Sequence, residues 1–343
     1  MSEHGSHPAP DKAATGNLPA RMKAITQKRY GNADVLSFGD VDLPEVPPNR
    51  VLVRVLASSL NMYDVHMTTG YPLLARLSAG LGRPKNPIPG ADVAGIVERV
   101  GADVDDFAAG DAVFGDVGNG AFAEYALAGP GSITHKPGPV SFQAAAAVPL
   151  AGITALQGLR DAGGLRAGQR VVINGASGGV GTFAVQIAKT LGAEVAAVCS
   201  TSKVDMVRSI GADVVVDYHT EDYTKQLRGY NLLFDNAGNR PWSETRQVLT
   251  DDGTTVAVTG PKHRIAGPLR RLLFRKLASS FGSQSLAWFI AQVNRDDLDT
   301  LGEWLSSGAI SPVIERTYDL EHVPDGLRYL SEGHAIGKLV IAN

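Results

Sequence analysis

Hydrophobic and polar positions follow two different periods along this chain. From Met22 to about residue 130, short apolar or alternating segments succeed one another, and Arg50 to Ser58 alternates over a full strand. From Arg170 onward, apolar strands alternate with amphipathic helical segments. The first pattern predicts a mostly antiparallel, partly open β-barrel, and the second predicts a doubly wound parallel sheet. The expected fold class is therefore α/β with a barrel domain.

The expected elements also divide the chain into domains. Strands are predicted in the second region at 170–174, 194–199, 214–218, 232–238 and 254–260, with helices at 182–191, 203–210, 220–227 and 241–249. An amphipathic helix at 296–306 is followed by strands near 313–318 and 338–342, with no helix expected after them. We expect these last strands to return to the first domain. The predicted division is a disordered leader at 1–20, a barrel domain at 21–145 and 300–343, and a parallel-sheet domain at 146–299.

A glycine-rich turn joins the first strand of the second region to its helix. Counted back from Gly181, the common fingerprint of three glycines has alanine at its first position. A strand, a glycine turn and a helix together direct free backbone N–H groups toward a diphosphate. We therefore expect this turn to bind a dinucleotide; its residues are Ala176, Ser177, Gly178, Gly179, Val180 and Gly181.

The end of the next strand indicates which dinucleotide is preferred. Enzymes that use NAD place an acidic residue there, about 20 residues past the turn. This chain has Cys199 followed by Ser200, Thr201 and Lys203. Hydroxyl groups and an ammonium would stabilise a 2′-phosphate, so we predict NADPH. Lys203 alone would be interpreted as a solvated residue of a first helical turn. Because the acidic residue typical of NAD enzymes is missing, we favour its interpretation as a 2′-phosphate ligand.

The composition excludes several classes of protein. The chain has 343 residues, 44% of them hydrophobic and 20% charged, with a net charge of −3 and one cysteine. There is no general basic field for nucleic acid, no set of cysteines for disulfides or a cysteine metal cluster, and no apolar run long enough for a membrane span. Without a signal-peptide core, the predicted location is cytoplasmic.

Several local motifs accompany the glycine turn. They are Pro87–Gly95 (PIPGADVAG), Gly110–Gly115 (GDAVFG), Gly120–Tyr125 (GAFAEY), Ala147–Ala155 (AVPLAGITA) and Gly337–Val340 (GKLV). With them, the chain resembles the medium-chain dehydrogenase/reductase superfamily, and within it the zinc-independent quinone oxidoreductase and enoyl reductase branch. The resemblance implies a GroES-like partly open β-barrel domain and a Rossmann domain. By the same analogy we expect a homodimer.

The zinc ligands of the related alcohol dehydrogenases are missing at the aligned positions. The cysteine position holds Asn61, the His-Glu pair has become Ala91-Asp92, and the third ligand region is apolar. Catalytic zinc needs three protein ligands with suitable donors. We therefore predict no metal site.

Further site residues follow from strand ends and from the resemblance. Asn236, Thr259 and Gly260 lie at carboxyl ends of predicted strands, where open α/β sheets bind ligands. The resemblance implies that Tyr218 contacts the 2′-phosphate, that Asn236, Thr259 and Gly260 line the path to the nicotinamide, and that Thr154 lies near its ring.

Chemistry without zinc calls for an acceptor that already delocalises charge, such as a quinone or an α,β-unsaturated carbonyl. The catalytic candidates are Asn61, Tyr63, Asp64 and His66. Tyr63 could donate a proton or a hydrogen bond, Asn61 could hold the substrate oxygen, Asp64 could anchor the loop, and His66 has a suitable intrinsic pKa. Equally, all four could only position the site.

Two alternative functions stay open at this point. The chain could be an NAD(P)-dependent alcohol dehydrogenase or carbonyl reductase, or a non-catalytic NADPH-binding sensor. The basic segment 262–276 is expected to be a solvated helix face, with a substrate lid or a membrane-facing patch as alternatives. The apolar loop 71–83 favours a bulky apolar conjugated substrate.

Overall fold

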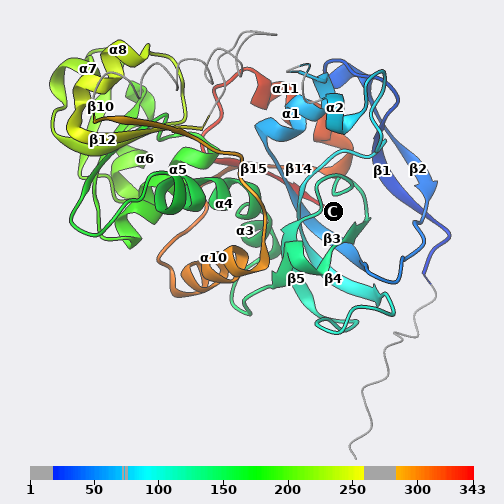
Figure 1. Ribbon diagram of the computed structural model, residues 1–343. Coiled ribbons are helices and arrows are strands. Elements are labelled where there is room, and N and C mark those ends of the chain that lie inside the picture. Colours follow the sequence, from blue (N-terminus) through cyan, green and yellow to red (C-terminus); the bar gives the residue numbers. More distant parts are fainter. Residues whose placement is uncertain (1–17, 72, 74–75, 259–282) are drawn as a thin grey trace, which may run out of the picture.

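Two β-sheets organise the chain, one in each half of the molecule (Figure 1). The computed structural model describes residues 18–71, 73, 76–258 and 283–343. One sheet has seven strands and is antiparallel except for the pair formed by its last two strands in sequence. The other has six strands, all parallel. The predicted α/β fold class, a GroES-like barrel beside a Rossmann domain, is confirmed.

The seven-stranded sheet joins the two ends of the chain. Its strands are β3 (Val51–Leu60), β4 (Asp92–Val100), β5 (Ala112–Asp116), β6 (Tyr125–Ala128), β7 (Ile133–His135), β14 (Ile314–Asp319) and β15 (Lys338–Ala342). The order is β14-β15-β3-β4-β5-β7, and β6 also pairs with β3. Strands β1 (Arg21–Gln27) and β2 (Leu36–Asp42) form a separate antiparallel pair. Because β15 lies against β3, the end of the chain completes a sheet that its first third began.

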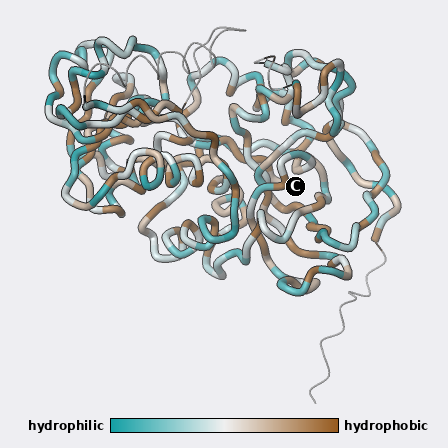
Figure 2. The backbone as a smooth tube through the Cα atoms, viewed as in Figure 1, coloured by the Kyte–Doolittle hydropathy of each residue, from teal (hydrophilic) through white to brown (hydrophobic). Residues whose placement is uncertain are grey.

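The parallel sheet has the order expected for a dinucleotide-binding fold. Its strands are β8 (Arg170–Asn174), β9 (Glu194–Cys199), β10 (Val214–Asp217), β11 (Tyr230–Asp235), β12 (Leu249–Ala257) and β13 (Ser285–Trp288), arranged β10-β9-β8-β11-β12-β13. Val171 and Ile173 pack on one face, and Val172 packs on the other. Burial on both faces explains why strands such as β8 and β9 are apolar along most of their length, and Figure 2 shows hydrophobic colour in this sheet.

Helices cover both faces of the parallel sheet and one edge of the barrel (Figure 1). The helices are α1 (Met62–Thr69), α2 (Arg76–Ala79), α3 (Phe142–Ala146), α4 (Pro149–Gln157), α5 (Gly179–Thr190), α6 (Val204–Ser209), α7 (Tyr223–Gln226), α8 (Trp242–Thr245), α10 (Arg295–Ser307) and α11 (Val323–Ser331). Short 3₁₀ turns occur at η1 (Ala33–Val35), η3 (Pro130–Ser132), η5 (Thr201–Lys203), η6 (Arg246–Val248) and η7 (Leu320–His322), and η4 (Gly158–Ala162) is a π-helical turn.

Three elements differ from the sequence expectation. Helix α11 lies between β14 and β15, where no helix was expected, and it provides the crossover that parallel strands need. Helix α1 occupies the segment that was read only as a loop of catalytic candidates. Strand β13 lies between the basic segment and the predicted helix at 296–306, where no strand was expected. The basic segment 262–276 and most of the predicted leader lie outside the described residues.

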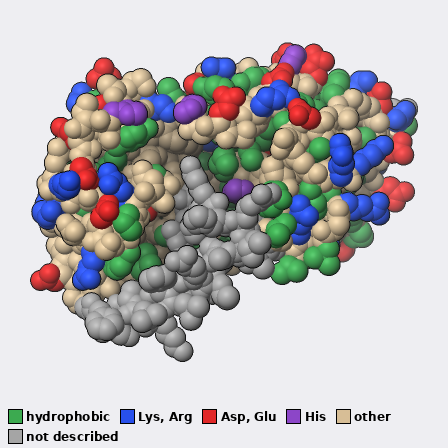
Figure 3. All heavy atoms as spheres, turned by 90° about the horizontal axis from the view of Figure 1, so that it is seen from above, with side chains coloured by type: hydrophobic (Ala, Val, Ile, Leu, Met, Phe, Trp, Pro, Cys, Tyr) green, Lys and Arg blue, Asp and Glu red, His purple; other side chains and the backbone are tan. Residues whose placement is uncertain are grey.

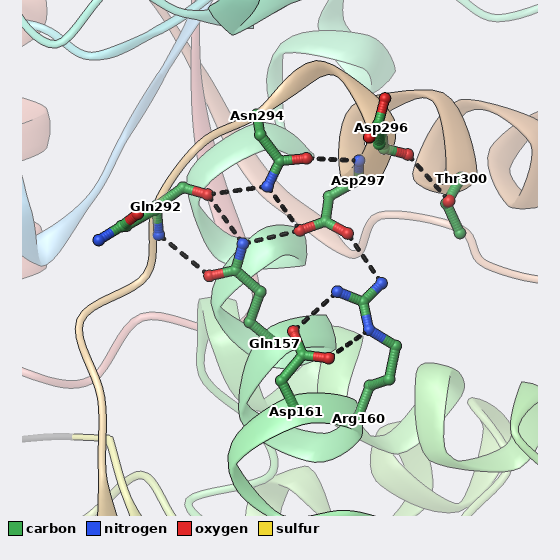
Figure 4. A network of polar contacts seen from close by, with 8 residues as sticks. All are labelled: Gln157, Arg160, Asp161, Gln292, Asn294, Asp296, Asp297 and Thr300. Carbon is green, nitrogen blue, oxygen red and sulfur yellow. Dashed lines mark hydrogen bonds and ion pairs between the residues drawn. The ribbon is translucent and has the colours of Figure 1, made fainter.

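A buried carboxylate fixes the segment that follows β13 to the helix that enters the Rossmann domain (Figure 4). Asp297 accepts hydrogen bonds from Arg160 Nη1 at 2.8 Å and from Gln157 Nε2 at 2.7 Å. Asn294 donates to the same carboxylate at 2.9 Å, and its own side chain caps α10 by accepting from Asp297 N. A fully hydrogen-bonded network of this kind holds α10 against the α4–η4 region.

Candidate active site

The glycine turn between β8 and α5 has the geometry of a phosphate-binding loop. A Cβ atom at Gly181 would lie 2.1 Å from the carbonyl oxygen of Gly175, so helix and strand approach too closely for any other residue. A Cβ atom at Gly178, by contrast, would lie 3.9 Å from its nearest neighbour, the Gly175 carbonyl oxygen, so there is open space before the helix. Ala176, at the first fingerprint position, is fully buried in the core. The first N–H groups of α5 therefore face an open site suited to an anion.

The predicted 2′-phosphate residues gather beyond the carboxyl ends of β9 and β10. Lys203 Nζ donates to the carbonyl oxygen of His334 at 2.8 Å. Tyr218 is exposed, and its ring lies against the ring of His219 in a tilted arrangement. Thr201 donates to the Asp217 carboxylate at 2.6 Å. Asp217 was not among the predicted site residues. Its carboxylate shows that the Thr201 hydroxyl is already engaged. Thr201 and Tyr218 are exposed, whereas Ser200 and Lys203 are half-buried.

Other predicted cofactor residues line the carboxyl ends of β8 and β11. Asn236 N donates to the carbonyl oxygen of Asn174, and the buried Asn174 amide donates to Asp235 at 2.8 Å. Thr154, on α4, donates to the carbonyl oxygen of Leu150. Thr259 and Gly260 lie outside the described residues.

The catalytic candidates fall on one short helix, but their side chains point to different surroundings. Asn61 is the N-cap of α1, and Asp64 completes a capping box by accepting from Asn61 N at 2.7 Å. Asp64 is buried, Tyr63 is half-buried and His66 is exposed. The structure therefore brings Asn61 and Asp64 together and separates His66 from them.

A buried cluster that the sequence analysis did not predict lies behind Asn61. The Asp92 carboxylate accepts hydrogen bonds from Ser59 Oγ at 2.6 Å, from Asn61 Nδ2 at 2.8 Å and from the Leu150 backbone N–H at 2.9 Å. Lys338 Nζ lies 3.4 Å from the same carboxylate and also donates to Asn61 Oδ1. All four groups are donors, which is the set that an ionised carboxylate accepts. Lys338 and Asp92 are both essentially inaccessible to solvent.

This cluster changes the interpretation of Asn61. The sequence suggested that its amide could hold a substrate oxygen, but the oxygen accepts from Lys338 and the nitrogen donates to Asp92. The geometry instead gives Asn61 a positioning role for the start of α1.

Burial changes the acid–base properties of several groups near this cluster. Desolvation and the nearby charge of Asp92 raise the pKa of Asp64 to about 8 and that of Asp116 to about 7. Burial, together with the Asp116 and Asp64 carboxylates, also raises the pKa of the Tyr63 phenol. Burial lowers the pKa of the Lys338 ammonium, and it lowers the pKa of His66 despite that side chain's exposed surface.

The glycine turn and the buried cluster meet where the last strand begins. Gly337 forms a parallel bridge with Gly178, and its backbone N–H donates to the Ser177 carbonyl oxygen at 2.9 Å. Lys338, the next residue, joins the buried cluster. Seen from above, the surface is hollowed between the two halves, with hydrophobic side chains exposed there (Figure 3). This arrangement, a dinucleotide loop opening onto a cleft between a barrel and a Rossmann domain, defines a two-domain nucleotide-dependent reductase fold.

Comparisons with known proteins agree with this class. Residues 47–138 match the alcohol dehydrogenase GroES-like domain, and residues 210–341 match a zinc-binding dehydrogenase family. A 2-methylene-furan-3-one reductase from Solanum lycopersicum is 31% identical over 347 residues, covering 97% of this chain and 82% of that protein. An NADPH-dependent alkenal/one oxidoreductase of Arabidopsis thaliana is 31% identical, with coverage of 99% and 84%. The quinone oxidoreductase from Coxiella burnetii superposes with a TM-score of 0.83 at 29% identity, covering 94% of this chain and 99% of that one.

The chain therefore belongs to the medium-chain dehydrogenase/reductase superfamily, in its quinone oxidoreductase branch. Within the described residues, no three His, Cys, Asp or Glu side chains are grouped so that they could hold a metal ion. None of the helices described here is long and apolar enough to cross a membrane. A cytoplasmic location stays a prediction.

Proposed function

We propose that this protein is a zinc-independent reductase that uses NADPH to reduce quinones or α,β-unsaturated carbonyl compounds. The observation that carries the proposal is the contact of Gly337 with the glycine turn, beside the buried Lys338. The contact supports the proposal because it brings the glycine turn, which we propose binds the dinucleotide, next to buried groups with shifted pKa values. The names of the relatives point to the same chemistry, since they include an NADPH-dependent alkenal/one oxidoreductase and a quinone oxidoreductase.

The residues of the loop fit NADPH. The open space at Gly178 and the N-terminus of α5 would hold the diphosphate, with Ser177, Gly179 and Val180 beside it. Lys203, Ser200 and Tyr218 would hold the 2′-phosphate, and Thr154 and Asn236 would line the inner part of the site. When bound, the cofactor supplies a hydride to the acceptor.

The residues at the zinc-ligand positions, and the hydrogen-bond donors around Asp92, support a reaction without zinc. Where alcohol dehydrogenases of the superfamily place zinc ligands, this chain has Asn61 and Ala91-Asp92. The Asp92 carboxylate is already compensated by the Lys338 ammonium and three further donors. A cation there would have to displace a buried ammonium. Without a metal to polarise a simple ketone, the acceptor must delocalise the incoming charge itself.

Among the catalytic candidates, Tyr63 is the group best placed to reach a substrate. It is half-buried, and its hydroxyl is held by the Asn119 side chain, so it can donate a hydrogen bond or a proton to the reduced acceptor. Asp64 caps α1, and Asn61 is held by the buried cluster, so both position the helix. His66 is exposed with a lowered pKa, which favours its neutral form near pH 7.

The acceptor class is tested by NADPH oxidation with a metal chelator present. A quinone and an α,β-unsaturated ketone should be reduced, whereas a saturated ketone should not, because only the first two delocalise the transferred charge. Rates should be the same with and without chelator. Turnover of the saturated ketone would instead favour a carbonyl reductase, and NADPH binding without turnover of any acceptor would favour a sensor.

The cofactor assignment is tested by Lys203→Ala. Removing the ammonium should weaken NADPH binding by about 5- to 50-fold, in line with one lost charge-assisted hydrogen bond, and leave NADH binding nearly unchanged. Fluorescence titration of both cofactors measures this directly. Lys225→Ala, which removes an exposed lysine on α7, is the matched control. An equal loss for both cofactors would show that Lys203 acts through its contact with His334 and not through the phosphate.

We further propose a homodimer, in which a second copy of this chain covers the β13 edge of the parallel sheet. Among the described strands, β13 lies at the end of the sheet order, and Trp288 and Ile290 beside it are 46% and 69% exposed. An open strand edge with large apolar side chains is suited to pairing with another strand.

Sedimentation velocity tests the dimer. Ile290→Lys should shift the protein from dimer to monomer, because a charge would be buried at the interface. Phe38→Lys changes another exposed apolar side chain, 42% exposed on β2, and should leave the dimer intact. A wild-type protein that is monomeric at micromolar concentration contradicts the proposal.

A further inference from the structure

A carboxylate stands at the end of β10, beside the strand end where the sequence lacks one. Rossmann folds that bind NAD place an acidic residue at the end of the second strand, where it binds a ribose hydroxyl. Here the second strand, β9, ends at Cys199, and its direct register partner is Asp217, the last residue of β10. Because the carboxyl ends of parallel strands meet at one edge of the sheet, Asp217 lies at the level of the missing acid.

Two hydrogen bonds fix the Asp217 carboxylate beside the turn that follows β9. Its Oδ2 accepts from the Thr201 hydroxyl at 2.6 Å, and its Oδ1 accepts from the His219 backbone N–H at 3.0 Å. The Thr201 hydroxyl, and then the His219 N–H, lower the pKa of Asp217, because both bonds stabilise the ionised form. Each carboxylate oxygen keeps a free lone pair, and the side chain is only half-buried, so it can still accept from a ligand.

The cation of the proposed 2′-phosphate site belongs to the same turn. Thr201 and Lys203 are the first and last residues of η5, and the Lys203 backbone N–H donates to the Ser200 carbonyl oxygen at 2.9 Å. Burial raises the pKa of the Cys199 thiol, the nearby Asp217 carboxylate adds to this rise, and the Lys203 ammonium opposes it. A negative and a positive group therefore both lie close to the end of β9.

The two charges are not cancelled by their own partners. Lys203 Nζ donates to the His334 carbonyl oxygen at 2.8 Å, which is a neutral group. Both hydrogen-bond donors of Asp217 are neutral as well. Asp205, a further carboxylate on α6, differs in this respect, because Arg208 pairs with it at 3.3 Å and it is fully exposed. Asp217 is therefore the carboxylate whose charge a bound phosphate would meet.

Cofactors with and without a 2′-phosphate would respond differently to this pair of charges. The phosphate carries about two negative charges near pH 7, so Lys203 would attract it and Asp217 would repel it. NADH has a hydroxyl group at that position, which can donate a hydrogen bond to the carboxylate. The pair of charges thus separates the two cofactors less strongly than Lys203 alone would.

We propose that Asp217 is a specificity-determining residue that limits the preference for NADPH and lets the same site bind NADH. This inference rests on the NADPH site of the proposed function. Lys203 favours the cofactor with the phosphate, and Asp217 sets how large that advantage is.

Fluorescence titration of Asp217→Asn with NADPH and with NADH tests the inference without any acceptor. The neutral amide still accepts one hydrogen bond, so the turn is kept. NADPH should bind about 2- to 10-fold more tightly, because the repulsion between two partly solvated anions is lost. NADH should bind equally or up to about 2-fold more weakly, because an amide oxygen is a weaker acceptor than a carboxylate. Asp217→Ser, a second neutral variant, should change the two affinities in the same directions.

Salt dependence and two further variants separate charge from structure. The gain of Asp217→Asn for NADPH should fall below about 2-fold in roughly 0.5 M salt, because salt screens exposed charges. Thr201→Val removes the hydroxyl and leaves the carboxylate, so NADPH should not bind more tightly. Glu194→Gln is the matched control, because Glu194 begins β9, roughly 16 Å from its end and beyond the Debye length of about 8 Å at physiological salt.

The outcomes that contradict the inference are distinct from those that contradict the proposed function. Weaker NADPH binding in both neutral variants, or unchanged affinities, would show that Asp217 only anchors Thr201. A gain that persists in high salt, or an equal gain in Thr201→Val, would show that its charge is not the cause. Each of these results would overturn this inference alone. A wild-type protein that binds neither NADPH nor NADH would overturn the proposed function as well.

Discussion

The arrangement of the cleft depends on one buried negative charge. A carboxylate removed from water is stable in a fold only if donors compensate it, and Asp92 has four. The donors come from separate places: the end of β3, the N-cap of α1, the first turn of α4 and the start of β15. Satisfying one charge therefore fixes four elements relative to one another. The first turn of α4 adds the favourable end of its helix dipole.

The position of Lys338 connects this charge to the nucleotide loop. Its backbone continues from Gly337, which pairs with Gly178 and donates to Ser177. A Cβ at Gly337 would lie 2.1 Å from the Val313 carbonyl oxygen, and its φ of +59° also favours glycine. The barrel and the Rossmann domain thus meet through backbone contacts at Gly337 and through the Leu150 N–H that donates to Asp92.

The parts of the fold that the sequence predicted are those with a strong local signal. Continuously apolar strands such as β8, and the glycine turn before α5, depend on neighbouring residues in the chain. Helix α1 was missed because its eight residues include Val65, Thr68 and Thr69, which have low helix propensity, and its stability comes from the Asn61–Asp64 capping box. The pair of an N-cap Asn and an acid three residues later was a visible signal for it. Helix α11 contains Gly326, which permits close packing on Leu60 but weakens the helical pattern.

The buried cluster could not be predicted from local patterns. Asp92 and Lys338 are 246 positions apart, and each is the first residue of a strand whose next residues are apolar. A lysine that begins a buried strand is usually solvated, so only the pairing of β15 with β3 reveals its partner. The same reasoning explains Asp116, whose neighbour across the sheet is visible only once the register is known.

A double-mutant cycle between Asp92 and Lys338 tests the central claim most directly. The free energy of unfolding in urea would be measured for the wild type, Asp92→Asn, Lys338→Met and the double variant. Each single change should cost roughly 3–5 kcal/mol, because each leaves a buried group without its charged partner. The double variant should lose at least about 1 kcal/mol less than the sum of the two. Additivity within about 0.5 kcal/mol would mean that the two groups are not coupled, and would contradict the view that this charge holds the cleft together.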